Sequence, residues 1–131
     1  MTELYRGFVK TRNKKGVEKF KDRTDLMNLK QAQQLDEFAG ILAENIVLVD
    51  FDDETHAKIA MDIVREEQLD CVTVKTSRGV HLYFKCNEHT QNCRTGASLA
   101  CGLKADIKLG SRNSYAICKF HGVEREAIYQ T

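Results

Sequence analysis

The feature that most constrains the fold is the stretch Ile46-Val-Leu-Val-Asp50-Phe-Asp52-Asp53. A short run of branched apolar residues predicts a buried β-strand. Because side chains alternate along a strand, Asp50 and Asp52 point to the same face, about 6.5–7 Å apart at Cα. Two carboxylates so placed can share one divalent cation or bridge a pair of cations. The alternative is that these acids only end the strand, with Asp53 capping the helix that follows.

Composition limits the classes of protein that the chain can belong to. At 131 residues, 42% hydrophobic and 30% charged, it predicts one folded domain rather than a disordered chain. A net charge of +1 excludes a uniformly basic nucleic-acid coat but allows a local basic patch. We expect no membrane partner, because no apolar run has transmembrane length and no signal-like segment begins the chain. Five cysteines, an odd number, predict reduced thiols in a cytoplasmic protein.

Two parts are expected within this domain, an N-terminal αβ unit over residues 1–45 and a second half over 46–131. The first would hold a strand over 4–11, a basic turn over 12–16 and a helix. The apolar residues expected to define that helix are Leu29, Ala32, Leu35, Phe38 and Ala39, with Gly40 as the stop. Between Lys10 and Arg23 basic residues crowd together, forming either a solvated loop or a surface that follows phosphates. We expect the whole to be a piece of a longer replication protein.

The second half predicts a helix after Asp53 and then strands over 71–76, 80–85, 105–109, 115–120 and 124–129. The short Ser77-Arg78-Gly79 connection predicts an antiparallel hairpin. The expected fold class is α/β (α+β), with a mixed, largely antiparallel sheet and helices on one face. The face packed on helices would carry Val47, Val49, Phe51, Val72, Val74, Val80, Leu82, Phe84, Ile107 and Leu109.

The opposite face is expected to gather the polar residues of these strands, namely Asp50, Asp52, His81, Tyr83, Asp106 and Lys108. Polar groups on an exposed sheet face are ordinary. Three carboxylates and a histidine from three strands, each near a turn, instead indicate a functional cluster. Clustered acids repel one another, so we expect that replacing one of them by its amide would not reduce stability and could increase it.

The order of these motifs resembles the archaeo-eukaryotic primase superfamily, and within it the primase-polymerase domains of phages and plasmids. That family has a strand ending in DxD, then a strand with histidine, then a strand with a third aspartate. The matching segments are Val-Leu-Val-Asp50-Phe-Asp52, Thr-Ser-Arg-Gly-Val-His81-Leu-Tyr-Phe and Ala-Asp106-Ile-Lys-Leu-Gly. The resemblance covers roughly residues 40–120 and implies the primase fold, with an RRM-like catalytic half.

The resemblance also implies an activity and a set of site residues. Asp50, Asp52 and Asp106 would hold two divalent cations, Mg²⁺ or Mn²⁺, for template-directed nucleotidyl transfer. His81 would contact the triphosphate, and further donors would come from Arg78, Lys108 and Arg112. Gly79 and its neighbour Ser77 would let backbone amides approach a phosphate. The implied work is primer synthesis, DNA polymerisation or both in phage or mobile-element replication. The implied partners are single-stranded DNA, nucleoside triphosphates and a replicative helicase in cis or in trans.

Three other functions fit part of the pattern. A haloacid-dehalogenase-type phosphohydrolase resembles Val47 to Thr55, with Asp50 as nucleophile and Asp52 as acid and base, although Thr55 falls one residue late. A metal-dependent nuclease could use the same three acids. A non-catalytic nucleic-acid-binding module with an RRM-like sheet would stack bases on aromatic residues, but only Tyr83 and Tyr115 are available.

A second metal site is a further candidate. Cys86, His89, Cys93 and Cys101 offer four zinc ligands within one loop between motifs. Zinc would order such a segment. The alternative is that these cysteines serve as small hydrophobic residues.

Overall fold

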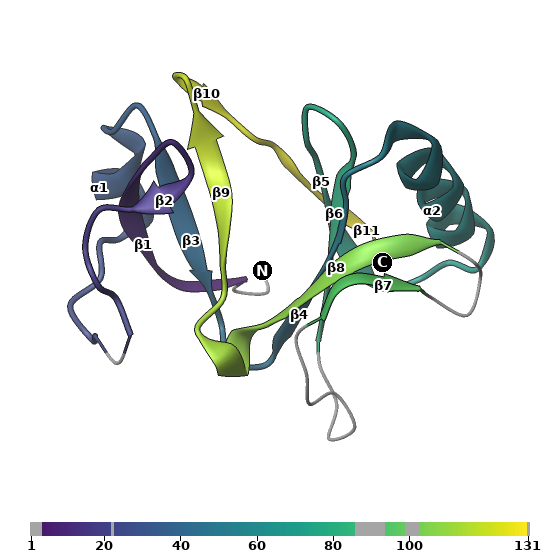
Figure 1. The fold of residues 1–131 in the computed structure, drawn as a ribbon, viewed down its shortest axis with the longest axis horizontal. Helices are drawn as coiled ribbons and strands as arrows, with labels where there is room; N and C mark the ends of the chain where they lie inside the picture. The colour runs from purple at the N-terminus through teal and green to yellow at the C-terminus, as the bar shows by residue number, and fades with distance from the viewer. Residues whose placement is uncertain (1–3, 22, 86–93, 99–102, 131) are drawn as a thin grey trace.

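Two antiparallel sheets stand side by side in the computed structural model, which describes residues 4–21, 23–85, 94–98 and 103–130 (Figure 1). The first sheet has the order β10-β9-β3-β1-β2. Its strands are β1 (Tyr5–Arg12), β2 (Lys15–Gly16), β3 (Phe38–Leu42), β9 (Tyr115–Phe120) and β10 (Val123–Glu124). The second sheet has the order β11-β5-β6-β4-β8-β7. Its strands are β4 (Ile46–Phe51), β5 (Cys71–Lys75), β6 (Val80–Lys85), β7 (Arg94–Ser98), β8 (Lys104–Leu109) and β11 (Ala127–Gln130).

The chain is mixed in class but mostly strand. Its helices within the described ranges are α1 (Leu29–Gln33), α2 (Glu54–Glu66) and the short 3₁₀ turn η1 (Gly110–Arg112). The sequence predicts one mixed sheet, whereas the structure has two sheets, and every strand pairing in the described ranges is antiparallel. Strands β9 and β10 lie late in the chain but belong to the first sheet, so the two sheets do not correspond to residues 1–45 and 46–131.

The prediction of a helix that extends to Ala39 is wrong beyond Gln33. Asn28 and Gln31 form a capping box at the start of α1, which ends at Gln33. Phe38 and Ala39 belong instead to β3, whose five residues are all buried. Because β3 lies between β1 and β9 and is covered on both faces, it is continuously apolar and carries no alternation that marks a strand. Its Gly40, expected as a stop signal, lies against the ring of Tyr5.

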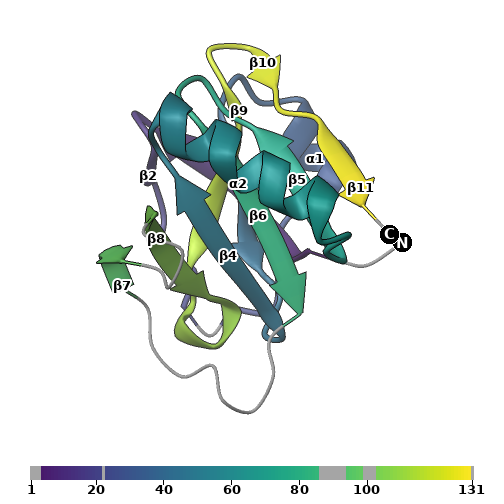
Figure 2. The same cartoon turned by 90° about the vertical axis from the view of Figure 1, so that its right-hand side faces the viewer.

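Helix α2 covers the face of the second sheet that is turned away from the first. The Asp53 carboxylate accepts a hydrogen bond from the amide of His56 at 2.9 Å, which caps the helix as expected. Figure 2 shows α2 lying across β4, β6 and β5. Its buried side chains and the sheet form one core cluster of Phe51, Ala57, Ala60, Val64, Cys71, Val80, Leu82, Leu103 and Ala105. The chain order β4-α2-β5-β6 places β6 between two parallel strands, which is a split βαβ arrangement.

The opposite face of the second sheet packs against the first sheet. Val72 and Val74, expected to face the helices, are on this side, because they pair with Tyr83 and His81 across the β5–β6 hairpin. Both faces of β5 are buried, so its alternation could not reveal which face meets the helix. The core between the sheets contains Leu4, Leu42, Ile46, Leu48, Val72, Val74, Tyr83 and Ala116. His81 and Tyr83 on this face are therefore interior, whereas Asp50, Asp106 and Lys108 are partly exposed.

A buried polar contact joins the two sheets within this core. The hydroxyl of Tyr5 on β1 lies 2.7 Å from the hydroxyl of Tyr83 on β6, and the two rings meet edge to face. Burial raises the pKa of both phenols, so both groups stay protonated hydroxyls at neutral pH. Each hydroxyl can donate or accept, so one of the two donates to the other across the sheets.

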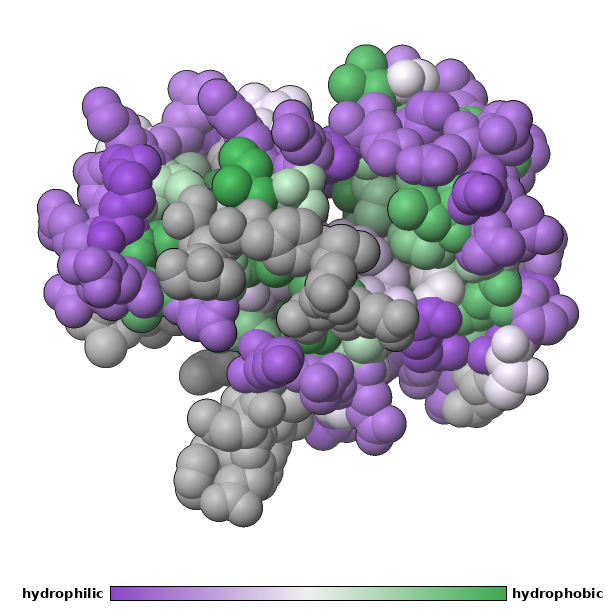
Figure 3. Space-filling model, turned by 180° about the vertical axis from the view of Figure 1, so that it is seen from behind, coloured by the Kyte–Doolittle hydropathy of each residue, from purple (hydrophilic) through white to green (hydrophobic). Residues whose placement is uncertain are grey.

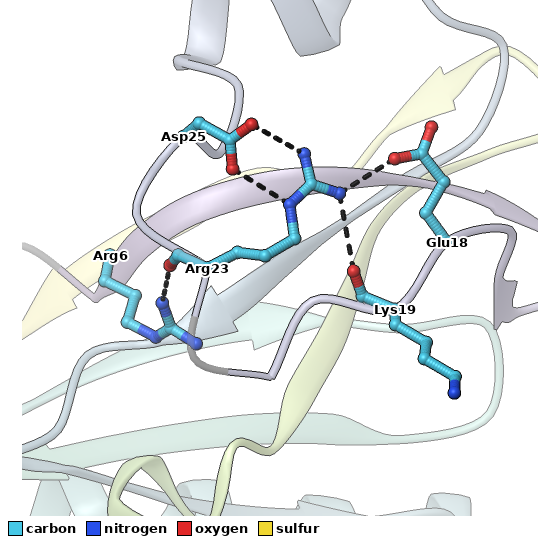
Figure 4. A network of polar contacts seen from close by, with 5 residues as sticks. All are labelled: Arg6, Glu18, Lys19, Arg23 and Asp25. Carbon is cyan, nitrogen blue, oxygen red and sulfur yellow. Dashed lines mark hydrogen bonds and ion pairs between the residues drawn. The ribbon is translucent and has the colours of Figure 1, made fainter.

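The basic N-terminal segment is partly structural. Figure 4 shows the Arg23 guanidinium held by both oxygens of Asp25, at 2.9 and 3.2 Å, and by Glu18 at 2.8 Å. Arg6 also donates to the carbonyl of Arg23 at 3.0 Å. These contacts hold the loop that places Phe20 and Leu26 against the outer face of the first sheet.

Within the described ranges, no helix is long and apolar enough to cross a membrane.

Candidate functional site

Three of the expected site residues form one row across the second sheet. Asp50 on β4 is paired directly with His81 on β6 and with Asp106 on β8. Residues directly opposite each other in an antiparallel sheet have Cβ atoms about 4.5–5.5 Å apart. Lys108 lies two pairs further along β8, opposite Leu48, and on the same face as Asp106. The structure thus brings together an imidazole, two carboxylates and an ammonium group.

The carboxylate of Asp50 lies in a partly buried and electropositive environment. Its side chain is 18% exposed, and its Oδ1 lies 3.4 Å from Nε2 of His81. Burial tends to raise the pKa of Asp50, but contact with His81 and the charges of Lys108 and Arg125 outweigh this and lower it. Asp50 is therefore ionised at neutral pH and available as an oxygen ligand.

His81 itself is buried, with 6% of its surface exposed. Its Nε2 faces Asp50, while its Nδ1 has no hydrogen-bond partner among the residues that the structure describes. A buried imidazole nitrogen without a partner is uncommon and indicates a polar group that a ligand or water would satisfy.

Asp52 lies just after the end of β4 and forms an ion pair with Arg78, with 2.5 Å between Oδ2 and the guanidinium. Both side chains are largely exposed. The expected DxD pair is thus divided between two partners, Asp50 with His81 and Asp52 with Arg78.

The β5–β6 turn that carries Arg78 is pressed against the end of β4. A Cβ on Gly79 would lie 1.6 Å from the carbonyl oxygen of Phe51, so only glycine allows this approach. The amide of Gly79 donates to Oγ1 of Thr76 at 3.0 Å, and the amide of Thr76 donates to the carbonyl of Gly79 at the same distance. The close approach expected of Gly79 exists, but toward backbone, and Ser77 is at the exposed tip of the turn.

A cleft of about 220 Å³ opens at this end of the sheet. Residues of the second sheet and its turns form one wall, and residues of the first sheet and its connections form the other. The lining residues are Lys14, Asp50, Asp52, Thr76, Ser77, Arg78, His81, Lys108, Tyr115, Ala116, Ile117 and Arg125. Four cationic side chains, from Lys14, Arg78, Lys108 and Arg125, surround the two carboxylates.

Sequence reasoning missed Arg125. It follows β10, and its amide and guanidinium donate to the carbonyls of Cys118 and Ile117, at 2.8 and 3.0 Å. These contacts hold it along β9 and beside the cleft. No local signal marks it, because an arginine between two short strands looks like any surface residue.

Arg112 is the expected phosphate donor that lies away from this group. It is exposed in η1, three residues past Leu109, which pairs with Val47 near the start of β4. Asp50 pairs with Asp106 toward the other end of β4. Arg112 therefore lies past the C-terminal end of β8, and the cleft lies toward the other end of this strand.

The structure also has a larger hollow of about 660 Å³, which shares Ile117 and Arg125 with the cleft. Its other lining is mostly apolar, including Tyr5, Phe8 and Phe38. From behind, Figure 3 shows hydrophobic residues gathered beside the notch between the two halves of the molecule. The smaller cleft is the better candidate for chemistry, because it alone contains Asp50 and His81.

The oxygen donors of the row suit a divalent cation. Carboxylate oxygens are the ligands that Mg²⁺ and Mn²⁺ prefer, and Asp50 and Asp106 supply them from adjacent strands. Over the described ranges, however, no group of three or more His, Cys, Asp or Glu side chains that could hold a metal ion is assembled. The chemistry of Asp50 and Asp106 fits such an ion, and Asp52 could join them only by leaving Arg78. The four candidate zinc ligands, Cys86, His89, Cys93 and Cys101, lie outside the described residues.

Comparisons of the chain with protein-family models, with curated proteins and with solved structures find no match.

Proposed function

We propose that this chain catalyses template-directed nucleotidyl transfer with divalent cations, as a DNA primase, a DNA polymerase or both. The observation that supports this proposal is the row His81–Asp50–Asp106, of which His81 and Asp50 line a cleft together with four cationic side chains. Acidic ligands beside a ring of cations suit a reaction at a polyphosphate, since the acids hold metal and the cations hold phosphate oxygens.

Under this proposal each residue has a distinct task. Asp50 and Asp106 would hold Mg²⁺ or Mn²⁺, and a bound cation would lower the pKa of the attacking 3′-hydroxyl and offset charge on the triphosphate. Asp50 is suited to this because it remains ionised. Arg78 and Lys108 would donate to phosphate oxygens, with Lys108 on the same face as the two acids. The imidazole of His81 would orient Asp50 and present its second nitrogen to the substrate.

The proposal extends to the fold family and the partners. The split β4-α2-β5 unit with β6 at its centre supports an RRM-like catalytic half of the archaeo-eukaryotic primase type. The partners would be single-stranded DNA, nucleoside triphosphates and a replicative helicase, in the cytoplasm.

Nucleotide incorporation on a single-stranded template, with and without a primer and with Mg²⁺ or Mn²⁺, tests the proposal. Asp50→Asn and Asp106→Asn should abolish incorporation while the protein stays folded. Asp70→Asn is the matched control, because Asp70 is an exposed acid outside the cleft. Full incorporation by Asp50→Asn would refute the assignment.

The same preparations separate the alternative functions. A nuclease would shorten the labelled template in the absence of nucleoside triphosphates. A phosphohydrolase would release inorganic phosphate without a template. A non-catalytic binding module would bind the template and show none of these reactions. Pyrophosphate release that requires both template and Asp50 is the result expected from nucleotidyl transfer.

A further inference from the structure

The cleft is built by both sheets, and the cations on its two walls come from distant parts of the chain. Arg78 and Lys108 belong to the second sheet and its hairpin turn. Lys14 belongs to the β1–β2 turn, and Arg125 follows β10 of the first sheet. The cationic side chains that line the cleft outnumber its carboxylates by two, so the site as a whole attracts anions.

Lys14 is held in place by more contacts than an exposed turn residue requires. Its amide and that of Asn13 donate to the Glu37 carboxylate, at 2.8 and 3.1 Å. Its carbonyl accepts a hydrogen bond from the Tyr115 hydroxyl at 3.0 Å. Asn13 and Lys14 both have positive φ, 52° and 69°, as a two-residue type I′ hairpin requires. The turn is thus fixed against β9 at the mouth of the cleft.

The ammonium group of Lys14 has a weak partner in this arrangement. It lies 5.0 Å from the centroid of the Phe120 ring, and a cation–π contact at an exposed site is a weak interaction. A phosphate oxygen is a stronger partner than a ring, because a charge-assisted hydrogen bond is shorter and stronger.

Arg125 is equally well placed. Its guanidinium uses one donor, Nη1, on the carbonyl of Ile117, and its charge acts on Asp50 across the cleft. A guanidinium has five N–H donors, so most of them remain to be satisfied by groups other than this carbonyl. His81 belongs to the same lining, and its buried Nδ1 has no hydrogen-bond partner in the part of the chain that the structure describes.

We propose that Lys14 and Arg125 bind the triphosphate chain of the incoming nucleotide from the side opposite Arg78 and Lys108, so that the substrate bridges the two sheets. This inference rests on the proposed function, and it adds two phosphate-binding residues that the motifs do not contain. The cleft, at about 220 Å³, is smaller than the usual 300–1,000 Å³ of a site that encloses a whole small molecule. It suits the phosphate chain alone, with the sugar and base outside.

Calorimetric titration with inorganic tripolyphosphate, without divalent cations and at low salt, tests the inference directly. Lys14→Asn removes the ammonium and keeps a residue that tolerates positive φ. It should weaken binding roughly three- to tenfold, in line with the loss of one charge-assisted contact. Lys15→Asn is the matched control, since Lys15 is exposed, adjacent and outside the cleft lining, and it should bind like the wild type.

Arg125 needs a pair of variants, because its contacts along β9 also support the fold. Arg125→Gln should weaken binding by a similar factor, and Arg125→Lys should recover most of the loss by restoring the charge. Thermal unfolding of each variant, compared with the wild type, would identify a loss of structure.

The outcomes distinguish this inference from the proposed function. If Lys14→Asn and Arg125→Gln both bind tripolyphosphate like the wild type, the inference is refuted while Asp50-dependent incorporation still stands. If the wild type binds neither tripolyphosphate nor a nucleoside triphosphate with Mn²⁺, both proposals are refuted. Weakening by Lys14→Asn that Lys15→Asn does not share supports the inference.

Discussion

Replacing Asp50 by asparagine should destabilise the protein, contrary to what the cluster of acids suggests from the sequence alone. Repulsion from Asp52 and Asp106 predicts that removing the charge relieves strain. In the structure, however, Asp52 is paired with Arg78, and Asp50 faces His81, Lys108 and Arg125. The pKa of Asp50 is lowered in the folded protein, so the folded state favours its charged form.

The size of the effect follows from these contacts. A hydrogen bond to a charged group contributes about 1.5–3 kcal/mol, and the 3.4 Å separation from His81 is long for such a bond. Burial of the carboxylate subtracts from this gain. We expect Asp50→Asn to lower the free energy of unfolding by about 1 kcal/mol near pH 5.

The pH dependence has a definite sign. A carboxylate with a folded pKa below its unfolded value of 3.8 contributes stability that is present above that value. This contribution is lost as the pH falls through the lower folded pKa. The difference in unfolding free energy between wild type and Asp50→Asn should therefore shrink below pH 3.8.

Urea denaturation followed by circular dichroism, at several pH values from about 5 down to about 3, measures this difference. Asp70→Asn serves again as the control and should change stability little, because surface substitutions usually lie within about 0.5 kcal/mol. An Asp50→Asn variant more stable than the wild type at pH 5 would show that repulsion between the acids dominates and would refute this reasoning.

Three further predictions concern the supports of the site. Tyr5→Phe and Tyr83→Phe should each destabilise the protein, and a double-mutant cycle in urea should give a coupling of about 1 kcal/mol for their hydroxyl pair; additive effects would contradict the contact. Gly79→Ala should cost several kcal/mol or prevent folding, since its Cβ would lie 1.6 Å from the carbonyl oxygen of Phe51, and an unchanged melting temperature would count against the tight turn. Burial raises the pKa of the Cys118 thiol to about 11, so in a background without the other cysteines it should react with iodoacetamide at pH 8 more slowly in the folded protein than in urea, and equal rates would contradict this.

Much of the second sheet was predictable from its local patterns. The strand ending in Asp50, the cap at Asp53 and the hairpin through Gly79 each depend on residues close together in the chain. The row His81–Asp50–Asp106 could be expected because each residue alternates with apolar neighbours on its own strand. Such periodicity shows which residues share a face of a strand.

The parts that the sequence did not predict depend on contacts between distant segments. Phe38 and Ala39 fit a helical spacing, and only the pairing of β3 with both β1 and β9 makes them strand residues. Arg125 joins the cleft because its segment lies along β9 and crosses between the sheets. No periodicity within one element encodes either fact.

The chain crosses repeatedly from one sheet to the other, so some strands pair with segments far away in the sequence. β3 pairs with β9, roughly seventy-five residues later, and β5 pairs with β11 at the end of the described chain. Contacts so distant in sequence close slowly, because large loops must be ordered first. During synthesis β3 would leave the ribosome before β9, and β5 before β11, so one edge of each strand would be open to other chains. Lys14, Asp50 and Arg125 meet only after β9 has docked, so we expect the cleft to be among the last features to form.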